Sequence, residues 1–234
     1  MIVSINQPAY LPWLGYFHRV AVSDAHIVLD QVQFEKNSFT NRNKVRTREG
    51  WCWLTVPVKT AGKFGDLAIA EIEIANEKQW AAKHWQTLRL NYSKAPFFAT
   101  HAPFFEGVYT RQWGKLADLT REITLYLLDA FGIRTRLYFG SRMKASGKKD
   151  ELVLNLCREL GAKEYLSGPL GRNYIREELF GEQKIAVRYD DYQHPEYSQV
   201  YPGFEPYMAA LDLLFNAGPA SLAIILQNEE TTSR

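Results

Sequence analysis

The chain has 234 residues, enough for one sizeable hydrophobic core, and its 46% hydrophobic and 23% charged residues are ordinary for a globular protein. Its 28 basic and 26 acidic residues leave a net charge of +2, too small an excess for a surface that follows a nucleic-acid backbone. The sequence lacks the run of roughly 20 apolar residues that a membrane-spanning helix needs, and its start lacks the pattern of a secretion signal. We therefore expect a cytoplasmic protein that binds a small molecule, and neither nucleic acid nor a membrane.

The two cysteines agree with this compartment. Cys52 and Cys157 lie in apolar stretches far apart in the sequence, and neither has the neighbours of a metal-binding motif. We expect both to be reduced thiols in the core, and we expect no metal site.

The first elements follow the order strand, loop, helix, strand. An apolar strand at Met1–Ile5 leads into the turn-rich stretch Asn6–Gly15, a helix begins within Tyr16–Val22, and a second strand follows at His26–Asp30. Such βαβ units form parallel sheets, and ligands of parallel sheets bind at the carboxyl ends of the strands. The loop Gln7–Tyr16, directly after the first strand, is therefore the first place to expect a ligand.

The middle of the chain departs from this pattern. Trp51–Val58 and Leu67–Ala75 alternate or run apolar like strands, and we expect them to pair as a hairpin inserted into the parallel core. Helical spacing of apolar residues predicts one helix capped by Asn76 and running through Asn91, and a longer one within Trp113–Phe131. A hairpin and helices thus form an insertion over about 51–112.

The second half returns to alternating helices and strands. We expect strands at Arg134–Phe139, Glu164–Leu166 and Ile185–Tyr189, and helices at Lys149–Leu160, Asn173–Leu179, Tyr207–Asn216 and Ala220–Leu226. Residues 1–234 therefore form a single α/β domain with a Rossmann-like, mostly parallel sheet flanked by helices.

The loop after the first strand has the composition of a binding loop. It combines prolines, which fix the backbone, with aromatic residues and with Gly15, which permits a close approach to the backbone. We expect Gln7, Tyr10, Trp13 and Tyr16 to line a substrate pocket. The alternative is a rigid aromatic crossover packed on the core.

A polar segment flanked by aromatic residues follows the second strand. Asp30 ends that strand beside the first loop, where a carboxylate can bind a hydroxyl or an amine, or act in catalysis. Asn41, Arg42 and Asn43 offer amide groups and a planar guanidinium fork for carboxylate or phosphate. We expect these residues to bind substrate, and a solvated loop is the alternative.

Histidine is scarce in this chain, and His84 is the main candidate for a general base. It lies in a helical pattern with Trp80 and Leu88 as neighbours, so a buried, hydrogen-bonded histidine is the alternative. His18 and His194 are weaker candidates for the same role.

A glycine-containing loop in the second half has the features of an anion site. The short strand Glu164–Leu166 enters a loop that contains Ser167, Gly168, Gly171 and Arg172, and a helix is expected to begin near the end of this loop. Exposed N–H groups together with a guanidinium bind phosphate or carboxylate. The alternative is a plain turn in which the glycines only relieve strain.

Several blocks together resemble the WbqC-like family. They extend over nearly the whole chain and are QPAYLPWLGYF, SDAHIVLDQVQFEKNSFTNRNKV, WLTVPV, KHWQTLRLNYSKAPFF, YLSGPLGRNYI and YPGFEPYMAALDLLFNAG. The resemblance implies a role in bacterial O-antigen or other surface-polysaccharide biosynthesis, and some members are proposed to be glycine transferases that acylate an amino sugar. It implies no agreed set of catalytic residues.

A more distant likeness is to nucleotidyltransferases of the HIGH type, which begin with a strand, a loop with proline and an H-x-G-H motif at a helix start. Trp13-Leu14-Gly15-Tyr16 stands at that place here, with aromatic residues at both histidine positions. The likeness implies that Ser167–Arg172 or Ser141–Lys149 grips phosphates, and that adenylylating chemistry is altered or lost.

These observations predict a transferase or ligase that attaches a small amino acid or acyl group, glycine among them, to an amine of a nucleotide-linked amino sugar. Arg42 and Arg172 would hold carboxylate or phosphate groups, and His84 or Asp30 would deprotonate the amine. ATP is a candidate cofactor. The alternative is a non-catalytic module that binds a nucleotide sugar or a partner within a biosynthetic complex. The sequence leaves the oligomeric state open.

Overall fold

The computed structural model describes residues 1–60 and 67–227 and contains a sheet whose neighbouring strands all run parallel. In spatial order its strands are β5 (Arg136–Phe139), β2 (Ala25–Val28), β1 (Ile2–Asn6), β6 (Glu164–Ser167) and β7 (Ala186–Tyr189). The chain order reverses between β1 and β6, as in Rossmann-like folds. The α/β class and the parallel sheet predicted from the sequence are confirmed.

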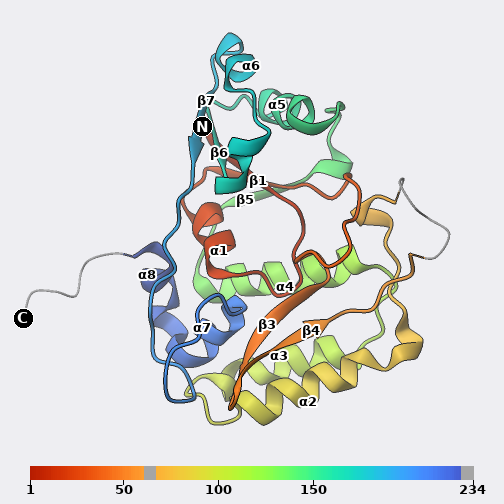
Figure 1. Cartoon of the computed structure of the whole chain (residues 1–234), viewed down its shortest axis with the longest axis vertical. Coiled ribbons are helices and arrows are strands. Elements are labelled where there is room, and N and C mark those ends of the chain that lie inside the picture. The colour runs from red at the N-terminus through yellow and green to blue at the C-terminus, as the bar shows by residue number, and fades with distance from the viewer. Residues whose placement is uncertain (61–66, 228–234) are drawn as a thin grey trace, which may run out of the picture.

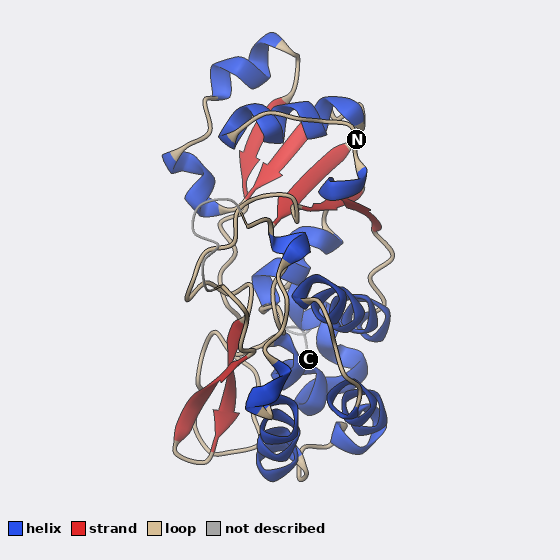
Figure 2. Cartoon of the chain, turned by 90° about the vertical axis from the view of Figure 1, so that its right-hand side faces the viewer, coloured by secondary structure: helices blue, strands red, loops and turns tan. Residues whose placement is uncertain are grey.

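Helices surround this sheet and extend away from it. In chain order they are α1 (Leu14–Ala21), α2 (Trp80–Tyr92), α3 (Phe98–Thr110), α4 (Leu116–Phe131), α5 (Lys149–Glu159), α6 (Glu177–Glu182), α7 (Ala210–Ala217) and α8 (Ser221–Leu226). Figures 1 and 2 show the parallel sheet near one end of the molecule and α2, α3 and a separate two-stranded hairpin at the other.

The two faces of the sheet are buried in different hydrophobic cores. On one face, Val3 and Ile5 of β1 belong to a core with Leu152 and Leu156 of α5 and Phe180 of α6. On the other face, α1 joins a larger core that also contains residues of the hairpin, α2, α3, α4 and α7. This second core holds the insertion against the sheet and brings α4 beneath the ends of β2 and β5.

The hairpin contains only one of the two strands that the sequence predicts. It pairs β3 (Arg42–Thr47) antiparallel with β4 (Gly50–Thr55), and Gly50 turns the chain at φ +124°, a conformation that favours glycine. Leu67–Ala75, predicted as the second strand, forms a 3₁₀ turn and isolated bridges instead. β3 ends only two residues before β4, so pairing these strands closes a much shorter loop than pairing β4 with Leu67–Ala75 would. The smaller loss of chain entropy favours the observed pairing.

The insertion also contains a helix that the sequence does not predict. α3 includes Pro103 and Gly107, residues that disfavour a helix interior, but its apolar side chains are buried against α2 and α7. Asn76 does not cap α2, which begins at Trp80; the Asn76 amide donates to the carbonyl oxygen of Trp113 instead. Tertiary contacts therefore decide that α3 forms and where α2 begins.

Two further findings concern the membrane and the cysteines. Within residues 1–60 and 67–227, no helix combines the length and the apolar character needed to cross a bilayer. Cys52 is half-buried, Cys157 is buried, and both are free thiols.

Candidate functional site

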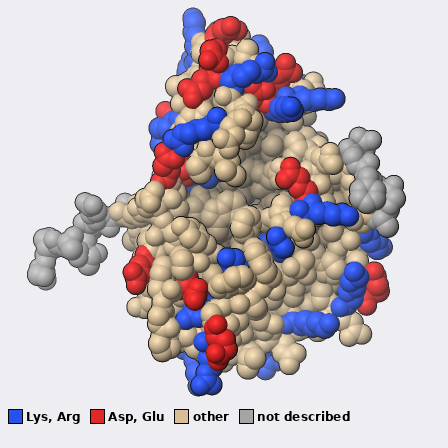
Figure 3. Space-filling model, viewed as in Figure 1, with Lys and Arg blue, Asp and Glu red and all other residues tan. Residues whose placement is uncertain are grey.

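Polar residues gather at the carboxyl edge of the parallel sheet. Because the strands share one direction, their carboxyl ends meet at a single edge, where parallel sheets bind ligands. The polar residues at or shortly after these strand ends include Asn6, Asp30, Ser141, Ser167 and Asp190. Figure 3 shows the surface hollowed between the sheet and the β3–β4 hairpin, in the same view as Figure 1. We take this edge as the candidate site.

Asp30 is held in place at this edge by the neighbouring strand end. Its carboxylate, 6% exposed, accepts the backbone N–H and the hydroxyl of Ser141, each at 2.7 Å. Gly140 lies against the end of the Gln31 side chain, which would have to move if this position carried a Cβ. A carboxylate has about four acceptor positions, so Asp30 retains capacity for a ligand N–H or O–H.

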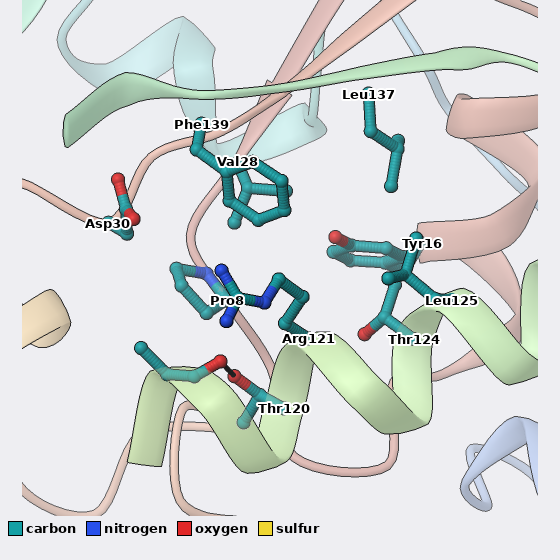
Figure 4. Close-up of a pocket in the computed structure, with 11 residues that line it drawn as sticks. Pro8, Tyr16, Val28, Asp30, Thr120, Arg121, Thr124, Leu125, Leu137 and Phe139 are labelled. Atoms are coloured by element: carbon teal, nitrogen blue, oxygen red, sulfur yellow. Dashed lines mark hydrogen bonds between the residues drawn. The ribbon is translucent and has the colours of Figure 1, made fainter. Parts of the chain in front are cut away.

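Asp30 and the loop after β1 line one pocket, as the βαβ topology predicts. The loop contributes Pro8, and Tyr16 comes from the first turn of α1, which follows the loop (Figure 4). The pocket has a volume of about 30 Å³ for the centre of a water-sized sphere, against the about 10–15 Å³ that one water needs. It therefore admits a group of a few atoms and is too small for a nucleobase. The rest of the lining comes from β2, β5 and α4 and consists of Val28, Leu137, Phe139, Ala117, Thr120, Arg121, Thr124 and Leu125.

Arg121 brings a positive charge to the same pocket. Figure 4 shows its side chain reaching from α4 across the pocket toward Pro8. Its guanidinium forms an ion pair with Asp118 at 2.7 Å and lies 5.5 Å from the centre of the Phe139 ring. A pocket that offers the carboxylate of Asp30, a guanidinium and an apolar wall suits a small ligand with both charges, such as an amino acid.

Hydroxyl groups add hydrogen-bonding capacity to this pocket. Thr120 and Thr124 are buried on α4, and the Thr120 hydroxyl donates to the carbonyl oxygen of Ala117 at 3.1 Å. Burial raises the pKa of the Tyr16 hydroxyl well above its usual range, so this group stays protonated and can donate to a ligand.

A buried arginine connects the strand ends where the chain order reverses. Arg19 of α1 is 6% exposed, and its guanidinium donates to Asp190 Oδ2 at 3.3 Å and to Asn6 Oδ1 at 2.5 Å. Gly168 lies against it, since a Cβ there would be 2.9 Å from Nη1. Asn6 Nδ2 is then buried without a hydrogen-bond partner among the described residues, and is available to an acceptor atom of a ligand.

The two weaker histidine candidates both contact the segment after β7. His18 Nδ1 lies 3.0 Å from Asp190 Oδ1, and the centre of its ring lies 4.7 Å from that of Tyr192. His194 contacts the carbonyl oxygen of Pro195 through Nδ1 and accepts the N–H of Tyr207 at Nε2. Both histidines thus anchor this segment.

The predicted anion loop is folded differently from the expectation. Residues Pro169–Asn173 form a 3₁₀ turn, and the next α-helix begins at Glu177 and is too short to offer a strong N-terminal dipole. Arg172 forms a double hydrogen bond with Asp191, at 2.7 Å for each nitrogen, and lies over the Tyr189 ring. The guanidinium fork is therefore engaged by a carboxylate of the chain itself.

The remaining residues of that loop have a packing role in the structure. A Cβ at Gly171 would clash with Ser167 Oγ, which is buried, so the turn requires glycine there. Gly168 lies beside the buried guanidinium of Arg19. These contacts agree with the plain turn that the sequence left as the alternative.

His84 is in an aromatic core and not at the sheet edge. Its Nδ1 is 2.8 Å from the hydroxyl of Tyr10, which in turn is 2.6 Å from the hydroxyl of Tyr109, and Trp80 packs edge-on against the imidazole. Burial lowers the pKa of His84 to about 4, so the ring is neutral at pH 7. These contacts correspond to the alternative of a buried, satisfied histidine, and they place Tyr10 in the core as well.

The polar segment at the start of β3 is mainly occupied by structural hydrogen bonds. The amide of Asn41 donates to the carbonyl oxygen of Val56 at 2.9 Å, and that of Asn43 donates to the carbonyl oxygen of Leu11. Arg42 donates to the carbonyl oxygen of Asn37 at 2.6 Å. These three residues hold the hairpin to the rest of the chain, and none lines the pocket of Asp30.

Gln7 and Trp13 flank the pocket without lining it. Gln7 is half-buried and directly follows β1. The half-buried Trp13 ring packs at 5.9 Å from Tyr16 and at 5.3 Å from Phe39, which precedes the hairpin. Trp13 therefore connects the candidate site with the hairpin.

Sequence reasoning missed the contribution of α4. Arg121, Thr120 and Thr124 come from a helix that the sequence predicts, but nothing local indicates that its polar residues face the sheet. Arg19 was also missed. Ser141 was considered only as the start of the stretch Ser141–Lys149 that the likeness to nucleotidyltransferases implies. It directly follows the glycine after a predicted strand, so the rule that ligands bind at strand ends also indicates it.

Within the part of the chain that the structure describes, no group of three His, Cys, Asp or Glu side chains is arranged to hold a metal ion.

The model of the WbqC-like protein family matches residues 7–224. A protein of Mycobacterium tuberculosis, named "Uncharacterized protein Rv1507c", is 39% identical over 218 residues, which cover 92% of this chain and 94% of that protein. No solved structure matches the chain.

Proposed function

Because the chain belongs to the WbqC-like protein family, we propose that it is a transferase or ligase acting on a small amino acid or acyl group in surface-polysaccharide biosynthesis. In this proposal the group is transferred to an amine of a nucleotide-linked amino sugar. The observation that supports it most is the small pocket at the carboxyl edge of the sheet, where Asp30 and Arg121 meet an apolar wall.

The size and charges of this pocket fit the donor. An amino acid such as glycine has an ammonium group for the carboxylate of Asp30 and a carboxylate for the guanidinium of Arg121. The hydroxyls of Tyr16 and Thr124 offer further hydrogen bonds. Larger side chains would meet Leu137 and Phe139, so the pocket favours glycine and other very small donors.

A second cavity, lined in part by Gln31, the residue after Asp30, has room for a larger, anionic molecule. It has a volume of about 700 Å³ for the centre of a water-sized sphere, in the size range of small-molecule sites, and Gln31, Ser146, Lys148 and Lys149 contribute to its lining. Its two lysines suit phosphates. A free carboxylate does not acylate an amine in water, so we propose that ATP activates the donor here.

The acceptor would enter where the chain order reverses, next to Asn6. Its amine has to be neutral to attack the activated carbonyl carbon, forming the C–N bond while the bond to the leaving phosphate breaks. Asp30 is a better candidate than His84 for handling the amine proton, because it lines the pocket while His84 is in the aromatic core.

The test is mass spectrometry of a panel of amino-sugar nucleotides incubated with the protein, ATP and glycine. We expect a product heavier than one acceptor by one glycyl group, lost in Asp30→Asn and Arg121→Gln. The matched controls are Asp129→Asn and Arg134→Gln, which break an exposed pair and should retain the activity. No product across a broad panel of donors and acceptors would contradict a transferase.

One observation favours a non-catalytic binding module as the second candidate. At the two positions where HIGH-type nucleotidyltransferases have histidines, Trp13 and Tyr16 are packed against other aromatic rings. A module would be stabilised by a nucleotide sugar in a thermal-shift panel while the same samples give no product. Stabilisation with turnover would contradict it.

A further inference from the structure

Four aromatic rings form a continuous row from the candidate site onto the hairpin. The ring of Trp13 is 5.3 Å from that of Phe39, Phe39 is 6.1 Å from Trp53, and Trp53 is 5.9 Å from Trp51. Three of these side chains are exposed to solvent, Phe39 at 45%, Trp51 at 42% and Trp53 at 36%. A contiguous row of exposed large aromatic residues offers a contact surface for a ligand.

The hairpin face that carries these rings is basic. Lys44 pairs with Trp53 across the hairpin, and its ammonium lies 4.1 Å from the centre of the Trp51 ring. The guanidinium of Arg42 lies 4.4 Å from the Trp53 ring. No acidic residue occupies an outward-facing position of either strand, so the face is complementary to a negatively charged molecule.

The row is held rigidly. The alternate side chains Val45 and Leu54 are buried in the large core, which fixes both strands from behind. At its other end, the backbone N–H of Tyr10 donates to the carbonyl oxygen of Phe39 at 3.0 Å and ties the row to the loop after β1. Figures 1 and 2 show the hairpin as an outer layer of the molecule, and in Figure 3 the surface hollow adjoins it.

We propose that this row, Trp13–Phe39–Trp53–Trp51 with Arg42 and Lys44, binds an acidic oligosaccharide that extends from the candidate site. Each sugar ring offers an apolar C–H face to an aromatic ring. The carboxylates of the oligosaccharide form ion pairs with Arg42 and Lys44. The proposed function names an amino sugar as the acceptor, and placing that amino sugar at the end of a sugar chain extends and rests on it. The binding surface itself rests only on the rings and charges.

Two other occupants fit this surface less well. The exposed parts of these three residues amount to roughly 300 Å², far below the about 800 Å² per partner of a stable protein interface. A nucleic acid is disfavoured by charge, because the chain has a net charge of only +2 and the row carries only Arg42 and Lys44 to follow a phosphate backbone.

The experiment titrates the protein, without ATP or glycine, with tetragalacturonate, neutral maltotetraose or the oligonucleotide dT8, using tryptophan fluorescence and calorimetry. We expect tetragalacturonate to bind more tightly than maltotetraose, and high salt to remove the difference. Trp51→Ala and Trp53→Ala should each weaken binding about tenfold. Leu90→Ala, which removes a more exposed apolar side chain from α2, should bind normally.

Lys44→Glu keeps every ring and reverses one charge, so it tests the surface even where a tryptophan variant fails to fold. It should abolish the preference for the acidic sugar and leave maltotetraose binding unchanged. Absence of saccharide binding, binding that survives all three variants, or binding of dT8 alone would overturn the inference. Because the titration needs no turnover, its failure alongside a positive transfer assay would leave the proposed function standing.

Discussion

Replacing Asp212 with alanine should destabilise the fold strongly. Asp212 is fully buried and accepts hydrogen bonds from the hydroxyls of Tyr92 and Tyr197 and from the amide of Gln199, at 2.7, 2.9 and 3.0 Å. Alanine would leave both hydroxyls without this acceptor, while Gln199 keeps the carbonyl oxygen of Glu205. At about 1–3 kcal/mol for each unsatisfied group, the expected loss of unfolding free energy is about 2–6 kcal/mol. For a domain of this length that lowers the melting temperature by about 4–24 °C.

The loss should depend on pH, because burial raises the pKa of Asp212 above its ordinary value of 3.8. The folded state then binds this proton more tightly than the unfolded state does. The stabilisation that Asp212 gains from this tighter proton binding is therefore complete below its pKa in the unfolded state. It is lost as the pH rises through its pKa in the folded state. The stability difference between wild type and Asp212→Ala should be largest in acid and become smaller toward neutral pH.

Urea unfolding followed by circular dichroism at several pH values between about 3.5 and 8 measures this difference. Asp212→Asn is the control, since it keeps the size of the side chain and removes the titration. Its stability relative to Asp212→Ala should not change with pH. A loss below about 1 kcal/mol would refute the buried-acceptor argument. A difference that grows with pH would show that the hydroxyl donors outweigh burial and lower the pKa.

Three other variants or treatments test the packing. Leu211→Ala should cost about 2–5 kcal/mol of unfolding free energy in urea, since Leu211 is fully buried, and a negligible change would show that α7 is peripheral. Cys52 and Cys157 together should accept two alkyl labels after denaturation without reductant, and an intact mass that shows no labels would contradict free thiols. In the native protein Cys157 should label slowly, because burial raises its pKa to about 12. Gly171→Ala should cost about 1–3 kcal/mol through its clash with Ser167 Oγ, and additional Ser167→Ala should recover part of that loss; equal losses in the single and double variants would exclude the clash.

The sequence predicts those features that depend on neighbours along the chain. The strand–loop–helix–strand order at the start identifies a parallel sheet, because a helix crossover returns the second strand in the same direction. The same order brings Asp30 beside the loop after β1, and the structure has both in one pocket. The second half is predicted for the same reason, with β5, β6 and β7 each within two residues of the expected bounds.

Long-range contacts decided the rest. His84 and Arg172 are polar residues whose roles depend on partners far away in the chain, Tyr10 in the first case and Asp191 in the second. Arg121 reaches the pocket only because the large core places α4 beneath β2 and β5. Periodicity shows which face of an element is apolar, but charge pairing and packing depend on which elements meet, and that is settled only when the whole chain folds.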